Sequence, residues 1–273
     1  MTVVSEPEEE YVVTVATYGR RTTVRSDVFL NHHVYGEPDG PIGMDYFVWV
    51  ARNEHRTVVV DTGFSRAGGE SRGRDLLVDV AGLYERIGVD PSAAPDVVVT
   101  HAHYDHIGNL GLFPQSRVHV AASEVEFWSG PHRRKPLFHH AVEESELDHL
   151  AEVVGSGRAH LTSGRTWVAP GIETIEVGGH TPGQTMVRVG TSTGWVLLAS
   201  DAVHYYEELE RAMPFTSVAD IVGMYDAFDT VRALVDDGEV QHVVAGHDPD
   251  TIARVATSVD DDGLVGTIGG GTR

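Results

Sequence analysis

The sequence predicts a layered α/β protein in which two β-sheets are covered by outer helices. Three observations point to this class. Short apolar segments rich in β-branched residues fall into two groups along the chain, each with helical segments around it. A chain of 273 residues, 41% of them hydrophobic, is long enough to bury a substantial core. No linker, repeat or composition break divides the chain, so we expect one domain over residues 1–273, with flexible tails at 1–10 and 260–273.

The first group of strands lies in the N-terminal half. The expected strands are residues 11–16, 47–51, 57–60, 96–100 and 118–121. Residues 29–46 contain several Gly and Pro residues and predict a long functional loop between two of these strands. Apolar residues at helical spacing predict a helix at 76–87 and another at 143–154, the latter closed by Gly155. A short helix is expected at 123–128, with Ser123 as its cap.

The second group of strands lies in the C-terminal half. The expected strands are residues 167–168, 172–177, 185–189, 195–199 and 240–245. Between the last two, residues 218–235 carry apolar side chains along one face and predict a long amphipathic helix.

Charge and composition exclude several classes of partner. The chain has 41 acidic and 20 basic residues, a formal net charge of -21. Nucleic acids and anionic membranes bind basic surfaces, so neither is expected as a partner. The chain has no cysteine, which excludes disulfides, thiolate nucleophiles and Cys-bound metals. The N-terminus lacks the basic and apolar regions of a secretory signal, and no apolar run approaches the ~20 residues that span a bilayer. We therefore expect a cytoplasmic protein that acts on a small molecule.

Four metal-binding side chains follow directly after the buried strand at 96–100. They are His101, His103, Asp105 and His106, within the run HAHYDH. Imidazole and carboxylate groups suit Zn, Fe, Mn or Co. A strand end followed by a tight turn allows alternate side chains to converge, so the run predicts a metal site.

Three more polar residues occupy the same kind of position. His180, Asp201 and His247 each lie just past the end of an apolar strand, close to glycine or another small residue. Strand ends present side chains to a shared crevice in layered α/β proteins. Any one of the three alone would be interpreted as structural, and most of the remaining histidines are expected to be structural or solvated. The joint pattern favours a shared metal site.

These motifs resemble the metallo-β-lactamase superfamily, which carries HAHYDH-like, GGHTPG, SDA and GHD segments in this order. The resemblance implies an αβ/βα sandwich with two mixed sheets face to face, helices outside, and two divalent metal ions, most often Zn²⁺ but with Mn, Fe or Co open. It assigns His101, His103 and His180 to the first metal and Asp105, His106 and His247 to the second. Asp201 would bridge the two. Asp61, in a DTG segment, would orient a ligand imidazole, or would simply cap a turn.

Within the superfamily the chain is most similar to the N-acyl homoserine lactonase group. The common β-lactamases use a Cys ligand, which is absent here, and the 26 residues after His247 (273 − 247) are too few for the helical domain of glyoxalase II. Members of the lactonase group are often dimers. One departure concerns chemistry: a Tyr commonly follows the bridging Asp by three residues, and here that residue is His204, followed by Tyr205 and Tyr206.

The expected activity is metal-dependent opening of a lactone, an N-acyl homoserine lactone or a related small lactone. Two cations that share a water lower its pKa, so the bridging hydroxide can attack the carbonyl at neutral pH. Asp105 is the candidate for proton transfer, although it could be a ligand alone, and His204 or Tyr205 is the candidate hydrogen-bond donor to the carbonyl. The alternative is another hydrolase on the same site, cleaving an ester, thioester, phosphoester or cyclic amide. Candidate wall residues of the pocket are apolar or aromatic: His33, Tyr35, Met44, Tyr46, Phe127, Trp128, Phe138 and Met213–Phe215.

Overall fold

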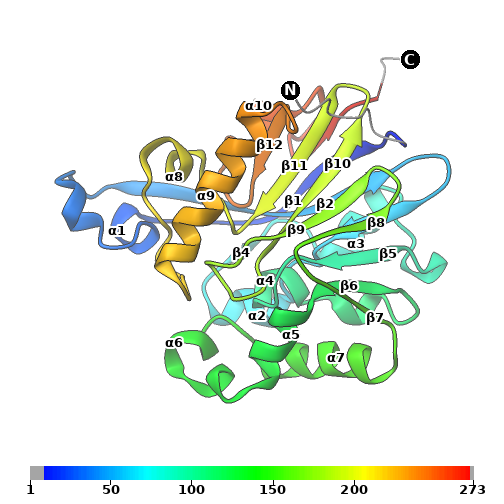
Figure 1. Ribbon diagram of the computed structural model, residues 1–273, viewed down its shortest axis with the longest axis horizontal. Helices are drawn as coiled ribbons and strands as arrows, with labels where there is room; N and C mark the ends of the chain where they lie inside the picture. Colours follow the sequence, from blue (N-terminus) through cyan, green and yellow to red (C-terminus); the bar gives the residue numbers. More distant parts are fainter. Residues whose placement is uncertain (1–8, 271–273) are drawn as a thin grey trace.

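The computed structural model describes residues 9–270 and contains two β-sheets with helices outside them (Figure 1). The expected tail at residues 1–10 lies mostly outside this range, as do residues 271–273. Within the described residues, no helix combines the length and the apolar character needed to cross a membrane.

The larger sheet contains nine strands in the described part of the chain. Their order is β13-β14-β1-β2-β3-β5-β6-β7, and β4 pairs with β1 off this path. The bounds are β1 Val12–Val24, β2 Pro41–Arg52, β3 Thr57–Val60, β4 Asp75–Leu76, β5 Asp96–Val99, β6 Val118–Ala121, β7 Ala159–Thr162, β13 Ser258–Val259 and β14 Val265–Ile268. Pairs from β3 to β7 are parallel, whereas β1, β2 and β14 pair antiparallel.

The smaller sheet has the order β12-β11-β10-β9-β8. Its strands are β8 Arg165–Ala169, β9 Ile172–Glu176, β10 Thr185–Thr191, β11 Gly194–Ser200 and β12 His242–Ala245. Only the β11–β12 pair is parallel. Both sheets are therefore mixed, and the predicted two-sheet sandwich is confirmed.

The core between the sheets consists of one face of each. Trp49, Val58 and Val98 of the larger sheet pack against Val187 and Leu198 of the smaller one, all of them buried. Burial of this apolar surface, worth about 25 cal/mol per Å², stabilises the face-to-face packing of the two sheets.

Helices cover the two outer faces. The α-helices are α1 Arg25–Val28, α2 Arg66–Ser71, α3 Val80–Arg86, α4 Tyr104–Ile107, α5 Ala122–Ser129, α6 Pro136–His139, α7 Glu144–Gly155, α8 Tyr206–Arg211, α9 Ile221–Asp236 and α10 Thr251–Val255. The 3₁₀ turns are η1 His32–Tyr35, η2 Pro91–Ala93, η3 Leu110–Leu112 and η4 Pro131–Arg134. Met224 and Phe228 of α9 pack on the smaller sheet, and Leu147 and Leu150 of α7 belong to the cluster on the larger sheet. Figure 1 accordingly shows α9 and α7 far apart, with the sheets between them.

Three local expectations are wrong. The loop expected at 29–46 ends at Gly40, because β2 begins at Pro41 and pairs with β1 along its whole length. The segment from Asp260 is not a loose tail, since Val265–Ile268 forms β14 against β1. Ser123 does not cap a helix: α5 begins at Ala122, and the Ser123 hydroxyl donates a hydrogen bond to Glu176 instead.

Candidate metal centre

The seven candidate ligands come together at one edge of the sandwich. His101, His103, Asp105 and His106 follow the C-terminal end of β5, and His180, Asp201 and His247 follow β9, β11 and β12. All seven are buried, each with 7% or less of its surface exposed. Within the described residues they form two groups whose candidate ligand atoms lie within 4.8 Å of one another.

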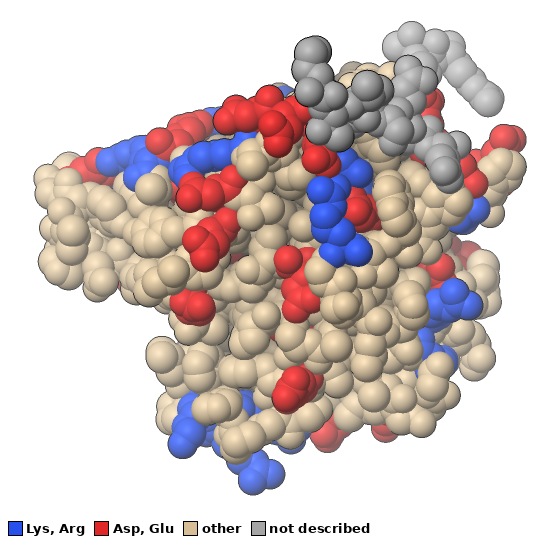
Figure 2. All heavy atoms as spheres, viewed as in Figure 1, with Lys and Arg blue, Asp and Glu red and all other residues tan. Residues whose placement is uncertain are grey.

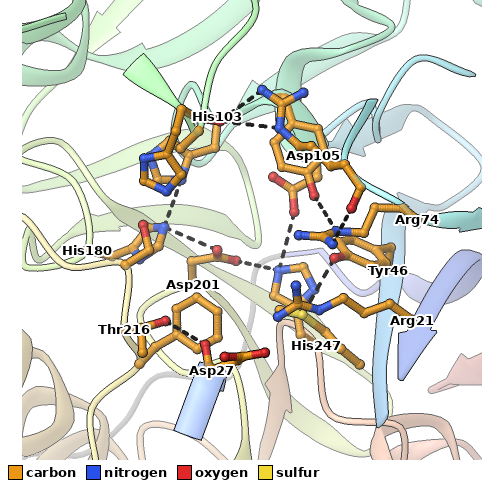
Figure 3. A pocket seen from close by; sticks show the side chains of 17 residues that line it. Arg21, Asp27, Tyr46, Arg74, His103, Asp105, His180, Asp201, Thr216 and His247 are labelled. Carbon is orange, nitrogen blue, oxygen red and sulfur yellow. Dashed lines mark hydrogen bonds and ion pairs between the residues drawn. The ribbon is translucent and has the colours of Figure 1, made fainter. Parts of the chain in front are cut away.

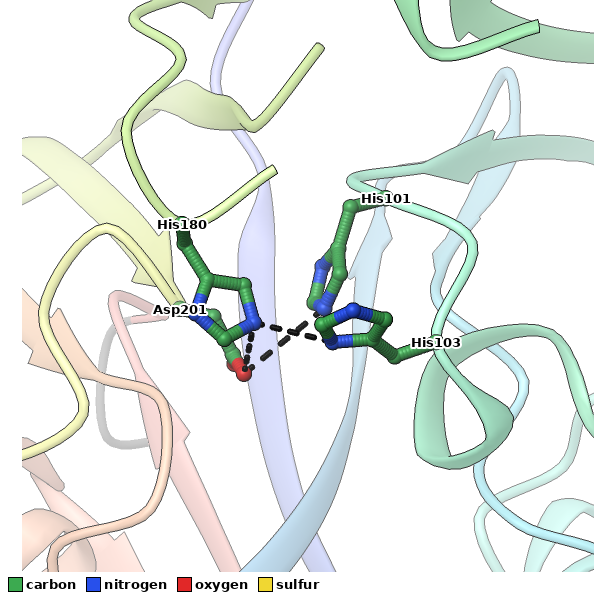
Figure 4. A group of neighbouring side chains, drawn as sticks. All are labelled: His101, His103, His180 and Asp201. Carbon is green, nitrogen blue, oxygen red and sulfur yellow. Dashed lines mark hydrogen bonds and ion pairs between the residues drawn. The ribbon is translucent and has the colours of Figure 1, made fainter. Parts of the chain in front are cut away.

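The first group contains His101, His103, His180 and Asp201 (Figure 4). Nε2 of His180 lies 2.9 Å from Nδ1 of His103 and 3.2 Å from Oδ2 of Asp201. Nε2 of His101 lies 3.7 Å from the same carboxylate oxygen. Three imidazoles and one carboxylate thus point at a common centre, which is the donor set of a tetrahedral zinc-type site.

The second group contains Asp105, His106 and His247. Nε2 of His106 and Nε2 of His247 lie 3.2 Å and 3.1 Å from Oδ1 of Asp201. Asp105 lies 3.8 Å from His106 and 3.9 Å from His247. One oxygen of Asp201 therefore faces each group, so this single carboxylate can serve two cations at once.

The burial of these side chains, and the protonation of the three histidines in the first group, fit metal ions. Nε2 of His101 and Nε2 of His106 are buried without a hydrogen-bond partner among the described residues, and burying such an atom without a partner is costly. Burial lowers the pKa of His101 and His180 well below the ordinary value, and that of His103 to about 4. These imidazoles are therefore neutral at pH 7 and present lone pairs. Burial opposes ionisation of Asp201, but His204 and His106 hold its pKa well below the usual range.

Asp61 orients the second group from behind. Its Oδ2 lies 2.7 Å from Nδ1 of His106, so the opposite ring nitrogen faces Asp201. Thr100 donates its backbone N–H and its hydroxyl to the same carboxylate, at 2.8 and 2.7 Å. Asp61 has a φ of 59°, a left-handed conformation that is unfavourable for a side-chain-bearing residue and is held by these contacts. These contacts are those expected of a residue that orients the His106 imidazole, rather than of one that only caps a turn.

Glu124 of α5 joins the two loops that carry the first group. Its side chain is fully buried and accepts hydrogen bonds from the backbone N–H of Ala102 and the indole of Trp128, at 2.8 and 2.7 Å. Its other oxygen accepts from the Thr181 hydroxyl and the Gly183 N–H, at 2.7 and 3.0 Å. A Cβ at Gly183 would lie 2.4 Å from the backbone nitrogen of Glu124, so only glycine permits this approach.

A cavity of about 460 Å³ opens over the two groups (Figure 3). Its wall includes the candidate ligands His103, Asp105, His180, Asp201 and His247. A second cavity of about 300 Å³ shares His103 and His180 with the first. Of the expected wall residues, Met44, Tyr46 and Phe215 line the first cavity, and Phe127, Trp128 and Phe138 line the second. His33 and Tyr35 line neither, and Met213 belongs to the core.

His204 and Tyr205 are not part of the cavity wall. His204 is fully buried behind Asp201, with its Nε2 3.0 Å from Oδ2, and its ring stacks on Phe215. Burial lowers its pKa, but Asp201 and Glu208 outweigh this effect and raise it to about 9. The phenol of Tyr205 donates to the carbonyl of Gly43 at 2.9 Å. Neither side chain is placed to contact a substrate carbonyl in the cavity.

Several site residues gave no signal in the sequence. Glu124 is one of 41 acidic residues and lies in an ordinary helical segment. Arg21, Arg72 and Arg74 line the cavity but belong to no motif. Tyr46 was expected only as a wall residue, and it lies in the cavity wall beside Asp105 and His247 (Figure 3).

The fold and the site define the chain as a metallo-hydrolase-type protein. The sequence model of the Metallo-beta-lactamase superfamily matches residues 43–247, and the chain belongs to this superfamily. An N-acyl homoserine lactonase from Bacillus sp is 25% identical over 224 residues, covering 76% of this chain and 80% of the relative. Metallo-beta-lactamase domain-containing protein 1 of Rattus norvegicus is 31% identical over 214 residues, covering 70% and 78%. The solved structure of AidC, a dizinc quorum-quenching lactonase with a bound product, superposes with a TM-score of 0.71 at 15% identity, covering 98% of both chains.

Proposed function

We propose that the protein is a metal-dependent lactonase that binds two divalent cations, foremost Zn²⁺, and opens an N-acyl homoserine lactone or a related small lactone. The observation that carries this proposal is the position of Asp201 between two donor groups on the floor of a cavity. The names of the relatives supply the reaction type, since both a homoserine lactonase and a dizinc lactonase are similar to this chain.

The metal ions, when bound, would polarise the ester carbonyl and lower the pKa of water. In lactone opening, the water oxygen bonds to the carbonyl carbon, the ring C–O bond breaks, and a proton moves to the leaving oxygen. Asp105 lines the cavity between His106 and His247, so its carboxylate is placed to carry that proton. One hydroxy acid leaves as the only product.

Tyr46 is the side chain of this chain that best fits the role of donor to the carbonyl oxygen. Its ring is buried and packs edge-on to His247, with the ring centres 5.1 Å apart. Burial raises the pKa of its phenol to about 12, so the proton stays on the oxygen at pH 7. The phenol makes a 3.6 Å contact with Sδ of Met44, a weak acceptor, and also hydrogen-bonds with the Tyr104 side chain. Tyr46 therefore takes the role that the sequence suggested for His204 or Tyr205.

The second cavity offers a place for an apolar substituent. Phe127, Trp128, Leu137 and Phe138 contribute to its wall, and it opens beside His103 and His180 of the first group. An acyl chain or aromatic ring on the substrate could occupy this space. At about 25 cal/mol per Å² of apolar surface, such contacts supply binding energy without setting the chemistry of the leaving group.

The test is lactone opening followed by proton release, with the protein as purified, after chelation and after metal is restored. We expect chelation to abolish activity and Zn²⁺ to restore it. Asp201→Asn should lack activity and bind less metal, whereas Asp236→Asn, at an exposed position of α9, should behave as the wild type. Full activity in the metal-free protein would refute the proposal. Testing a thioester, phosphoester and cyclic amide in parallel decides whether another hydrolysis is the main reaction.

A further inference from the structure

The wall of the first cavity carries three arginines in a chain of formal net charge -21. Acidic and basic side chains are scattered over the face of the molecule drawn in Figure 2. Arg21 comes from β1, and Arg72 and Arg74 lie between α2 and β4. Arg72 is neutralised by an ion pair with Glu143 and lies over the Tyr104 ring, 4.1 Å from its centre. The other two arginines have no such carboxylate partner, and the reason lies in their position.

Arg21 is a guanidinium without a partner. Its Nε is buried and has no hydrogen-bond acceptor among the described residues. No described carboxylate lies within ion-pair distance of it, whereas the adjacent Arg20 lies 3.6 Å from Asp45. Because β1 side chains alternate between faces, Arg20 and Arg21 point to opposite sides, and Arg21 faces the cavity.

Arg74 is held in place by neutral groups. Its Nε donates to the Tyr104 hydroxyl at 3.2 Å, and a terminal nitrogen donates to the carbonyl of Arg72 at 2.6 Å. No described carboxylate forms an ion pair with it. Figure 3 shows Arg21 and Arg74 on the same side of the cavity, flanking Tyr46 beside Asp105 and His247.

The acidic residue Asp27 also lines this cavity but forms no ion pair with Arg21 or Arg74 among the described residues. It is seen beside Thr216, whose hydroxyl donates to the Asp27 backbone carbonyl at 2.9 Å. Its own carboxylate accepts from Thr23 at 2.8 Å. Arg21 and Arg74 therefore bring two positive charges to the side of the cavity that adjoins the second donor group, where Asp105 of that group is the neighbouring carboxylate.

Unpaired, partly buried guanidinium groups are costly unless an anion completes them, and arginine binds carboxylate and phosphate oxygens in a two-pronged geometry. We propose that the substrate carries an anionic group, a carboxylate or a phosphate, which Arg21 and Arg74 bind while the scissile carbonyl lies at the donor groups. This inference rests on the proposed lactonase function. It narrows the substrate from neutral N-acyl lactones to lactones or esters with an anionic substituent.

The experiment compares three γ-lactones that differ only in one substituent, which is a carboxylate, its neutral primary amide or a phosphate. We expect the wild type to prefer an anionic lactone over the neutral amide by about 10- to 100-fold in kcat/KM. The anion with the higher kcat/KM shows whether the substrate carries a carboxylate or a phosphate. Arg21→Met should remove this preference by raising KM for the anionic substrate, with little change for the amide. Arg21→Lys should keep part of the preference, and Arg117→Met, at an exposed site outside the cavity, should keep all of it.

Equal kcat/KM for the anionic and neutral members in the wild type, or an equal loss for both in Arg21→Met, would overturn the inference and leave lactone opening intact. If the wild type opens none of them, nor an N-acyl homoserine lactone, the lactonase proposal fails, and calorimetry on the metal-loaded protein then tests the arginines alone. Glutarate and inorganic phosphate are the probes. Binding at least about tenfold weaker in Arg21→Met than in Arg117→Met supports the anion site, and equal binding refutes it. Thermal melting shows whether each variant is folded. If Arg21→Met fails to fold, Arg74→Met takes its place in both experiments.

Discussion

Replacing Glu124 tests whether the first donor group depends on one buried carboxylate. Glu124→Ala would leave three buried N–H donors without an acceptor, on Ala102, Trp128 and Gly183, and would also release the Thr181 hydroxyl. At roughly 1–3 kcal/mol per buried donor, the loss is about 3–9 kcal/mol before water enters the vacated space. We expect about 4 kcal/mol, a large part of the total stability of a domain.

Glu124→Gln separates the loss of hydrogen bonds from the loss of volume. The amide retains one acceptor oxygen and turns the other position into a donor, which the Thr181 hydroxyl can accommodate by rotating, so that one or two N–H groups lose their acceptor. We expect a loss of about 1–3 kcal/mol. Because Glu124 fixes the loops of both His103 and His180, metal affinity should fall by about 10- to 100-fold in either variant.

The assay is urea unfolding together with competition against a chromophoric chelator. Glu126→Gln is the matched control, since Glu126 is exposed on the same helix. We expect the control to match the wild type in both measurements. If Glu124→Ala unfolds at the same free energy as the control and retains its metal equally well, the reasoning about Glu124 is wrong.

Three further predictions concern the surroundings of the site. Asp61→Asn should weaken metal binding by about 10- to 100-fold, because His106 loses the carboxylate that orients it; chelator competition measures this. Burial raises the pKa of Glu146 to about 7, so the folded state binds this proton more tightly than the unfolded chain does. The free energy of unfolding of the wild type in urea should therefore fall relative to that of Glu146→Gln by up to about 3 kcal/mol as the pH rises from 4 to 8. A difference between the two proteins that stays constant over this pH range would contradict the prediction. Gly183→Ala should cost about 1–3 kcal/mol in urea unfolding because its Cβ would clash with α5, whereas Gly155→Ala, with open space around it, should not.

The candidate ligands could be predicted from the sequence because each lies within a short polar segment that follows an apolar strand. A short apolar strand has a recognisable pattern, and the polar residue that follows it lies at a sheet edge wherever the strand is placed. His101 and His247 are examples: both follow short apolar runs, and the structure brings their strands to the same edge. The pattern predicts that such residues converge without requiring the order of the strands.

Other features depend on tertiary packing that no local pattern encodes. Strand β14 is glycine-containing and has few apolar residues, so the sequence resembled a mobile tail; its pairing with β1 supplies the order instead. Glu124 has the pattern of a surface residue until α5 is packed against the loops at Ala102 and Gly183. Local propensity and periodicity do not reveal which segment packs against β14 or Glu124, and that packing determines their structural role.

The extended β1–β2 hairpin was predicted in part from the sequence and depends in part on tertiary packing. Both strands continue well beyond the apolar runs that predicted them, and the added residues include Arg21, Met44 and Tyr46, all of which line the cavity. Arg21 pairs with Met44 in the register of the hairpin, so the position of the cationic group is fixed by backbone hydrogen bonds rather than by a flexible loop. The donor groups, in contrast, lie just after β5, β9, β11 and β12. The candidate metal centre and the part of the cavity wall that carries Arg21, Met44 and Tyr46 therefore belong to separate elements. The proposed reaction and the proposed substrate preference accordingly depend on different parts of the chain.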